Sequence, residues 1–240
     1  MDVLINNAGI QGPDDMPANT AETIEELQTV LLADPEGWGS TFAINTSAIG
    51  MVSMAFLKLL DAGNRRRGWE SGKIPADRAR RREKESLGEK GIVLDDQRSS
   101  QIITVASISG LNRRITSGLA YGASKAGAIH LSKMLAHLLG PWGIRSNVIN
   151  SGGKFTGTPI FLMDSIKNPL ISRHIAVYPS AMSTGFGDSY PYTEVPAGRK
   201  GNFHDIAGVV LYLVGKAGAY SNGNMVNTDG GRLTVMPATS

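Results

Sequence analysis

The stretch Val105–Lys125, VASISGLNRRITSGLAYGASK, decides the expected fold of this 240-residue chain. It begins at the end of an apolar run, Gln101–Val105, which is typical of a buried strand. It ends in a helix-like segment that starts near Gly118. Tyr121 and Lys125 are four residues apart and therefore lie one turn apart on the same face of that helix. The C-terminal end of such a strand is where open α/β sheets bind their ligands.

These residues also carry a possible acid–base chemistry, because Ser107 at the end of the strand is expected to meet the helix face with Tyr121 and Lys125. A phenol has a pKa of about 10 and is a poor acid and a scarce base at neutral pH. A neighbouring ammonium group favours the phenolate and lowers that pKa. We interpret Ser107 as the hydrogen-bonding partner of a substrate carbonyl or alcohol, and Tyr121 as the group that gives or takes the proton. Taken alone, this Tyr-xxx-Lys spacing would indicate only an interfacial ring beside a solvated lysine, because short motifs occur by chance.

Further motifs accompany this stretch along the chain. In chain order they are Asn6-Asn7-Ala8-Gly9 after the run Val3–Ile5, Asn45 in FAINTSAIG, Ser107, Tyr121 and Lys125, Ser151-Gly152 and Thr156. In this combination the chain resembles the short-chain dehydrogenase/reductase family, whose marks are NNAG, a helix asparagine, serine, YxxxK and PGxxxT. The segment VPAGRKGNFHDIAGVVLYLV and the turn Asp229-Gly230-Gly231 also resemble that family. The similarity is greatest to its 3-oxoacyl-carrier-protein reductase-like branch, and it covers nearly the whole chain outside residues 62–100.

The resemblance implies a fold and a function. The fold is a Rossmann-like, doubly wound parallel sheet in one α/β domain over residues 1–240. The function is hydride transfer between NAD or NADP and a carbonyl or alcohol substrate, for example a 3-oxoacyl thioester. Tyr121 would be the proton donor or acceptor and Ser107 the substrate anchor. Lys125 would lower the pKa of Tyr121 and contact the ribose, and Asn45 would hold a water that relays protons through Lys125. The residues implied in cofactor binding are Asn7, Ala8, Gly9, Tyr121, Lys125, Gly152, Lys154 and Thr156.

The family's glycine-rich phosphate turn has no counterpart ahead of Asn6. A βαβ unit needs roughly 30 residues, so the first strands and their helices are expected to be absent. The pyrophosphate cradle and the residue that selects NAD or NADP are then absent too, which leaves the choice of cofactor open. The strand Val3–Ile5 would have an unpaired edge. The chain is therefore predicted to be an N-terminally truncated reductase. The alternative is a catalytically silent paralogue, or a wrongly started gene model, that acts, if at all, as a non-enzymatic oligomer partner.

Residues 62–100 interrupt the pattern with a charged insert of poor periodicity. We predict a solvated, partly disordered segment at the far end of the sheet. A retained unspliced segment is an alternative, and so is a nucleic-acid surface. We do not expect nucleic-acid binding, because acids are interspersed with the bases and Trp69 is the insert's only aromatic residue.

The other predicted elements are helices at Thr20–Ala33, Thr41–Leu60, Leu119–Leu139 and Asp205–Gly215, strands at Ile144–Ile149 and Asn224–Thr228, and a substrate loop at Phe155–Pro196.

Composition sets the remaining limits. The chain has no cysteine, which excludes disulfides and thiolate metal sites, and its four histidines show no metal-ligand spacing, so no metal is expected. No apolar run reaches membrane-spanning length and no secretory signal precedes Val3, so a cytoplasmic protein without membrane contact is expected.

The resemblance implies a homodimer or homotetramer built on the helices Thr41–Leu60 and Leu119–Leu139. Ser151 stands where the family has proline, so a looser loop is expected there.

Overall fold

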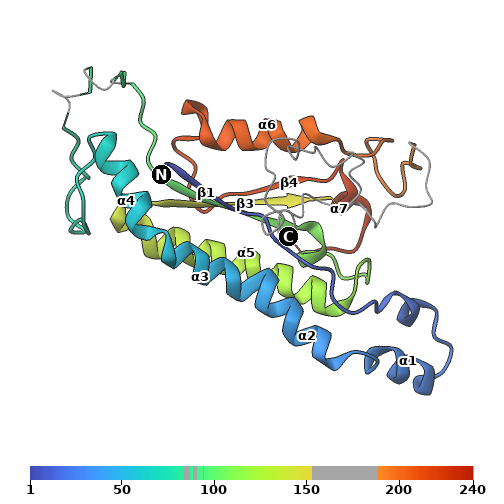
Figure 1. Ribbon diagram of the computed structural model, residues 1–240. Coiled ribbons are helices and arrows are strands. Elements are labelled where there is room, and N and C mark those ends of the chain that lie inside the picture. Colours follow the sequence, from blue (N-terminus) through green and yellow to red (C-terminus); the bar gives the residue numbers. More distant parts are fainter. Residues whose placement is uncertain (84–86, 89–90, 94, 153–188, 240) are drawn as a thin grey trace, which may run out of the picture.

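A four-stranded parallel sheet forms the centre of the molecule, in the order β1-β2-β3-β4 (Figure 1). The computed structural model describes residues 1–83, 87–88, 91–93, 95–152 and 189–239. The strands are β1 (Val3–Asn6), β2 (Gln101–Ser107), β3 (Arg145–Ser151) and β4 (Met225–Thr228). The predicted α/β fold with a Rossmann-like parallel sheet is confirmed.

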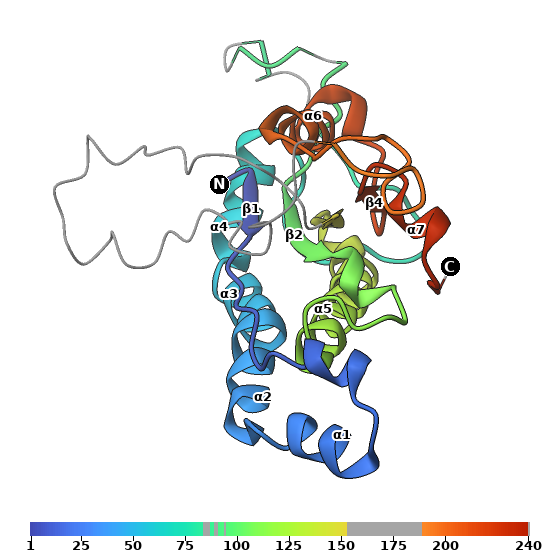
Figure 2. The ribbon, with the colours of Figure 1, turned by 90° about the vertical axis from the view of Figure 1, so that its right-hand side faces the viewer.

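Helices cover both faces of the sheet (Figures 1 and 2). One face carries α3 (Ala48–Ala55), α4 (Leu57–Arg66) and α5 (Leu119–Leu139), and the other carries α6 (Phe203–Val214). Successive residues of β2 point to opposite faces: Ile102 packs in a cluster with Leu60, and Ile103 packs in a cluster with Leu213. Every residue of β2 and β3 is buried, as expected for parallel strands covered on both sides.

The helix that carries Tyr121 and Lys125 has the predicted bounds, Leu119–Leu139. Gly118, with φ of 112°, precedes its first turn, and Gly140-Pro141 opens the short 3₁₀ turn that follows it. These residues explain both ends, because few other residues tolerate such a φ and a proline cannot continue a helix.

The predicted helix Thr41–Leu60 is part of a longer helical run. It consists of α2 (Pro35–Phe42), a π-helical segment (Ala43–Ser47), α3 and α4. The predicted helix Thr20–Ala33 is shorter in the structure, as α1 (Ile24–Leu31), and Asp34 already caps α2 by accepting a hydrogen bond from the Gly37 amide. No single helix in the described ranges is long and apolar enough to cross a membrane. The run Pro35–Ala55 passes that test only together with α4, from which it is bent by 49°.

Within the described residues β1 pairs only with β2, so its other edge is open, as predicted. Ile5 is 44% exposed there. In the part of the chain that the structure describes, β1 is thus the edge strand of a parallel sheet.

The prediction of a solvated insert is wrong for several of its residues. Leu87 is 1% exposed, and the Trp69 indole Nε1 donates a hydrogen bond to the Arg98 carbonyl at 3.0 Å. Arg67 bridges Asp2 and the buried Asp96 through hydrogen-bonded ion pairs of 3.2 and 3.1 Å. These described residues lie near the start of β2, at the end of the sheet opposite Ser107, which agrees with the predicted location (Figure 1). The arginines find acceptors in backbone carbonyls and carboxylates, and the insert is therefore packed in part.

Candidate active site

Lys125 is a buried ammonium group in the middle of the site. Its side chain leaves α5 towards the sheet, the residue is only 3% exposed, and its Nζ donates a hydrogen bond to the Val105 carbonyl at 3.3 Å. The Nζ lies 5.7 Å from the centroid of the Tyr121 ring. Burial lowers the pKa of Lys125 to about 8, because desolvation disfavours the charged form. Lys125 and Tyr121 are therefore brought together as predicted.

Ser107 is the last residue of β2 and lies against α5. Its Oγ accepts a hydrogen bond from the Ser109 amide at 3.2 Å, which starts a tight turn. Gly110 in this turn packs on the backbone of α5: a Cβ atom there would lie 2.6 Å from the Ala126 nitrogen. A Cβ atom on Gly122, the neighbour of Tyr121, would lie 3.2 Å from the Ser109 carbonyl oxygen. These two glycines place the end of β2 directly beside the first turns of α5.

Asn45 is fully buried and lies in the π-helical segment. Its Oδ1 accepts from the Ile10 amide at 2.8 Å, and its Nδ2 donates to the Ile10 carbonyl at 2.8 Å and to the Ser124 Oγ at 3.0 Å. Asn45 therefore joins the loop after β1 to the helix of Lys125. Its side-chain amide is engaged by protein groups, so the predicted water relay would have to use a different part of Asn45.

The segment Asn7–Gly9 follows β1 and borders the same site. A Cβ atom on Gly9 would lie 3.1 Å from Asn45 Oδ1 and 3.2 Å from Lys125 Nζ. These distances leave little room for a side chain, which explains the glycine. Ala8 and Gly9 are exposed, so this edge is open to a ligand. The structure therefore brings Gly9, Asn45 and Lys125 together.

Gly152 forms another border of the site, at the end of β3. Its amide donates to the Thr228 carbonyl at 2.9 Å, and a Cβ atom there would lie 2.5 Å from the Asp229 Cα. Ser151 pairs with Ser107 on one side and Thr228 on the other, so β3 continues to Ser151 where a looser loop was expected. Lys154 and Thr156, and residues 155–188 of the predicted substrate loop, lie outside the described residues.

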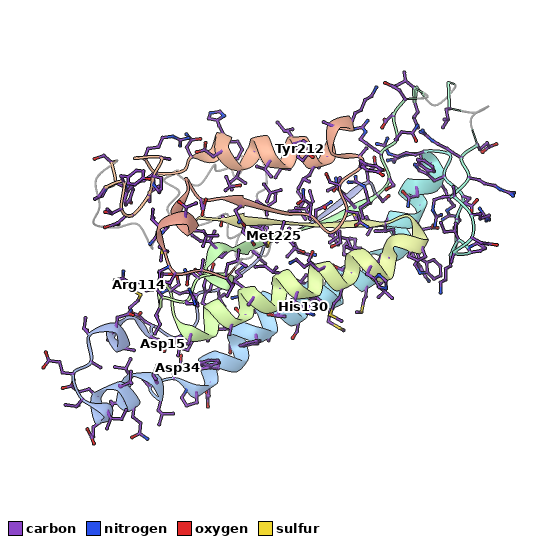
Figure 3. The ribbon with its side chains drawn as sticks, turned by 180° about the vertical axis from the view of Figure 1, so that it is seen from behind. Asp15, Asp34, Arg114, His130, Tyr212 and Met225 are labelled. Carbon is purple, nitrogen blue, oxygen red and sulfur yellow. The ribbon has the colours of Figure 1, made fainter. Side chains whose placement is uncertain are left out.

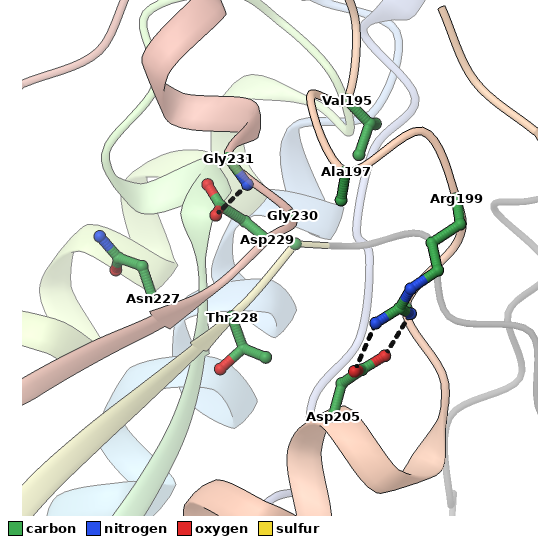
Figure 4. A pocket seen from close by; sticks show the side chains of 11 residues that line it. Val195, Ala197, Arg199, Asp205, Asn227, Thr228, Asp229, Gly230 and Gly231 are labelled. Carbon is green, nitrogen blue, oxygen red and sulfur yellow. Dashed lines mark hydrogen bonds and ion pairs between the residues drawn. The ribbon is translucent and has the colours of Figure 1, made fainter. Parts of the chain in front are cut away.

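A cavity of about 310 Å³ adjoins Gly152 (Figure 4). Its wall includes the turn Asp229-Gly230-Gly231 and Arg199, which forms a two-pronged ion pair with Asp205 at 2.7 and 2.8 Å. This ion pair holds the pKa of Asp205 down at about 2. Among the predicted site residues that the structure describes, the cavity meets only Gly152, so it lies beside the described catalytic groups.

Ser124 is not among the predicted site residues, yet it accepts from Asn45 through its Oγ and from Thr46 Oγ1 through its carbonyl, the latter at 2.8 Å. Both bonds depend on the π-helical turn that aims Asn45 and Thr46 at α5. That turn leaves no signal in the apolar periodicity, so only the position of Ser124 next to Lys125 could have drawn attention to it.

Comparison with known proteins connects this geometry to a chemistry. A family model for short chain dehydrogenases matches residues 91–161. The short-chain dehydrogenase/reductase PhomF' of Diaporthe leptostromiformis is 33% identical over the whole chain and 67% of that protein. A rhamnolipids-biosynthesis 3-oxoacyl-[acyl-carrier-protein] reductase of Pseudomonas aeruginosa is 34% identical over 55% of the chain and 44% of that protein. The Pseudomonas aeruginosa RhlG/NADP active-site complex superimposes with a TM-score of 0.58 at 24% identity, over 96% of this chain and 66% of that one. The chain thus spans about two thirds of the length of PhomF' and of RhlG.

Proposed function

The chain belongs to the short-chain dehydrogenase/reductase family, a family of NAD(P)-dependent oxidoreductases, and we propose that it interconverts a carbonyl and an alcohol with NAD or NADP. The observation that carries this proposal is the buried Lys125 ammonium group, 5.7 Å from the Tyr121 ring and close to the strand end that bears Ser107. The choice between NAD and NADP stays open.

The residues on the nicotinamide side fit such a cofactor. An ammonium group has three N–H donors, and in the described part of the chain the Lys125 Nζ donates one hydrogen bond, to Val105. The remaining donors suit ribose hydroxyls. Gly9 and Gly152 let the backbone of the site walls pack closely on Lys125 and on Asp229, since a Cβ atom at either position would meet neighbouring atoms within about 3 Å. Asn7 and Ala8 extend this wall, and Lys154 and Thr156 are proposed to complete it.

The bound cofactor would supply or accept the hydride. Tyr121 is half-buried on α5. Its hydroxyl would donate the proton to the substrate oxygen during reduction and remove it during oxidation. Ser107 would hold that oxygen by a hydrogen bond. The Lys125 ammonium group would stabilise the Tyr121 phenolate, because an opposite charge nearby favours the charged form. Positioned proton transfer of this kind typically contributes roughly 10²–10⁴-fold in rate.

The test is turnover of a panel of ketones, secondary alcohols and 3-oxoacyl thioesters, followed as NADH or NADPH absorbance. Tyr121→Phe is expected to lower turnover by roughly 10²-fold or more while the affinity for the cofactor stays unchanged. Tyr220→Phe is the matched control, because Tyr220 is fully exposed. Equal turnover of Tyr121→Phe and wild type would contradict the assignment of Tyr121. Absence of turnover in the wild type, at a cofactor concentration above the measured dissociation constant, would favour the silent oligomer partner, which the open edge of β1 also supports.

We also propose a homodimer or homotetramer that forms through α3 and α5. Large apolar side chains are exposed on these neighbouring helices: Met51 at 68%, Met54 at 54%, Met134 at 56% and Leu138 at 58%. Exposed apolar groups gathered on one face are typical of protein interfaces. Sedimentation of the wild type should show the oligomer and sedimentation of Met54→Glu should show the monomer. A cytoplasmic location remains a prediction.

A further inference from the structure

Asp15 is a buried carboxylate at the start of the catalytic helix. It is 1% exposed, and its Oδ2 accepts a hydrogen bond from the Leu119 amide at 2.7 Å. Leu119 is the first residue of α5, and Tyr121 follows two residues later. Figure 3 shows Asp15 next to this end of α5. The carboxylate therefore caps the helix from a loop that lies 104 residues away in the sequence.

The helix cannot provide this cap itself. Its N-cap residue is Gly118, which has no side chain and forms no side-chain cap. A Cβ atom on Gly118 would collide with the Pro13 carbonyl oxygen, so the Asp15 loop is packed too closely for a local capping side chain. The first amides of a helix have no partner within the helix, and a buried amide without a partner is costly. Asp15 supplies the missing acceptor.

Burying a carboxylate costs free energy unless its charge is compensated. In the described part of the chain Asp15 has no ion pair with a basic side chain, so its charge is compensated by the amide of Leu119 and by the positive end of the 21-residue helix α5. A serine or threonine would satisfy the amide without a buried charge. Asp15 thus supplies a hydrogen-bond acceptor at one particular place, the turn that holds Tyr121.

The loop of Asp15 makes a second contact with the same region. Asn19 donates a hydrogen bond through its Nδ2 to the Ile115 carbonyl at 3.1 Å. Ile115 lies in the segment between Ser107 and Tyr121, so the loop holds both this segment and the first turn of α5. The loop itself continues from Gly9 through Ile10, whose amide and carbonyl are fixed by Asn45. The wall of the proposed cofactor site and the helix of the proposed acid are therefore joined by one short, doubly anchored stretch of chain.

We propose that Asp15 is a positioning residue, which fixes the first turn of α5 so that the Tyr121 hydroxyl faces Ser107 and the substrate oxygen. The part that concerns catalysis rests on the function proposed above. Asp15 touches neither substrate nor cofactor and acts through Tyr121. Small displacements of a catalytic group cost up to about 10²-fold in rate, so a change at Asp15 is expected to lower kcat rather than to weaken cofactor binding.

The experiment compares Asp15→Ala, Asp15→Asn and Thr23→Ala in the full chain. Asp15→Ala removes the acceptor. Asp15→Asn keeps an amide oxygen that can accept from Leu119 but removes the charge. Thr23→Ala is the matched control, because Thr23 caps α1 through the Glu26 amide at 3.2 Å, and α1 lies away from α5 (Figure 2).

The first measurement is amide hydrogen exchange at Leu119, Ala120 and Tyr121, together with the ring resonances of Tyr121 assigned with Tyr121→Phe. In Asp15→Ala these amides should exchange at least about tenfold faster and the ring resonances should shift, while Asp15→Asn and Thr23→Ala should resemble the wild type. This measurement needs no turnover, so it remains decisive if the proposed function fails. Unchanged exchange and an unchanged Tyr121 ring in Asp15→Ala would overturn the proposal.

The second measurement is kcat together with the dissociation constant of the cofactor. The expected result is a kcat lower by about 10- to 100-fold in Asp15→Ala, restored to within a few fold in Asp15→Asn, with the same cofactor affinity in both. Should Asp15→Ala be too unstable to purify, Gly118→Ala takes its place, because a Cβ atom at Gly118 would push against the Pro13 carbonyl oxygen and so displace the first turn of α5 from the helix side. A kcat equal to that of the wild type in variants whose first turn exchanges rapidly would show that Asp15 only stabilises the helix.

Discussion

Asn45 holds Ile10 by both of its backbone groups: Oδ1 accepts from the Ile10 amide and Nδ2 donates to the Ile10 carbonyl, each at 2.8 Å. The arrangement imitates a strand pairing with a side chain in place of a second backbone. It fixes the loop after β1 at the point where Gly9 approaches Lys125. The integrity of the site therefore depends on the donor as well as the acceptor of this amide.

Replacing Asn45 by Asp should destabilise the fold. A carboxylate cannot donate to the Ile10 carbonyl or to Ser124, and it would bury a charge beside acceptors. The expected loss is about 1–3 kcal/mol in the free energy of unfolding, measured by urea denaturation. Asn202→Asp is the control, because Asn202 is exposed and its capping bonds to His204 and Asp205 need only an acceptor. A loss in Asn45→Asp no larger than in the control would mean that the donor is dispensable.

Lys125 should make the stability depend on pH in the alkaline range. Its pKa is lowered from 10.5 in the unfolded chain to about 8 in the fold, so between these values the unfolded chain binds more protons. Stability then rises with pH from about 8 to about 10.5, and the cost of burying the ammonium group is fully present below pH 8. Relative to Lys125→Met, the wild type should gain about 3 kcal/mol across this window. The measurement is urea unfolding of both proteins from pH 7 to 11, and parallel curves would contradict the shift.

Asp96 should show the opposite behaviour in acid. The Arg98 side chain, hydrogen-bonded at 2.6 Å, lowers the pKa of this 4% exposed carboxyl well below its usual 3.8. The stabilisation is present above the unfolded pKa and is lost as the pH falls through the folded one. Asp96→Asn is therefore expected to lower the unfolding free energy at pH 7 by a few kcal/mol, about the size of a broken buried pair, and by much less in strong acid.

The control for Asp96 is Asp95→Asn, because Asp95 pairs with Lys216 at the surface and its carboxylate is 75% exposed. An exposed pair of this kind contributes about 0–1 kcal/mol. Thermal unfolding at several pH values measures both variants, and similar small losses in the two would show that the Asp96 cluster in the insert is not a structural element.

The 240-residue chain is expected to bind NAD(H) and NADP(H) weakly. The described sheet stops at β1, and the helix N-terminus that usually receives a pyrophosphate belongs beyond that edge. Each missing charge-assisted hydrogen bond is worth about 1.5–3 kcal/mol, so losing two or three lowers affinity roughly 10³-fold or more. Calorimetric titration with both cofactors checks this, and micromolar affinity for either would contradict it.

The sequence predicts α5 with the observed bounds, because Gly118 and Gly140-Pro141 act locally on the backbone. It also predicts that Ser107, Tyr121 and Lys125 lie together, because strand end and helix face follow from periodicity. The π-helical turn at Asn45 is not predictable in this way, since it is accompanied by hydrogen bonds to Ile10 and Ser124, which are distant in the sequence. The packing of the insert escapes prediction for a related reason: arginines indicate solvent exposure, whereas the carbonyls and carboxylates that bind them depend on the tertiary structure.

The π-helical turn Ala43–Ser47 affects which single-residue deletions the protein tolerates. A turn of this type contains one residue more than an α-helical turn, so deleting a residue within it leaves a regular α-helix whose flanking parts keep their orientation, whereas deleting a residue within α3 would rotate α4 by about 100°. A deletion in 43–47 would keep Ser53, which accepts from the Asn6 side chain, and Leu60, which packs on Ile102, at the sheet, whereas a deletion in α3 ahead of Ser53 would turn both away from it. Under selection for the folded protein, single-codon deletions in 48–52 should therefore be lost more readily than single-codon deletions in 43–47.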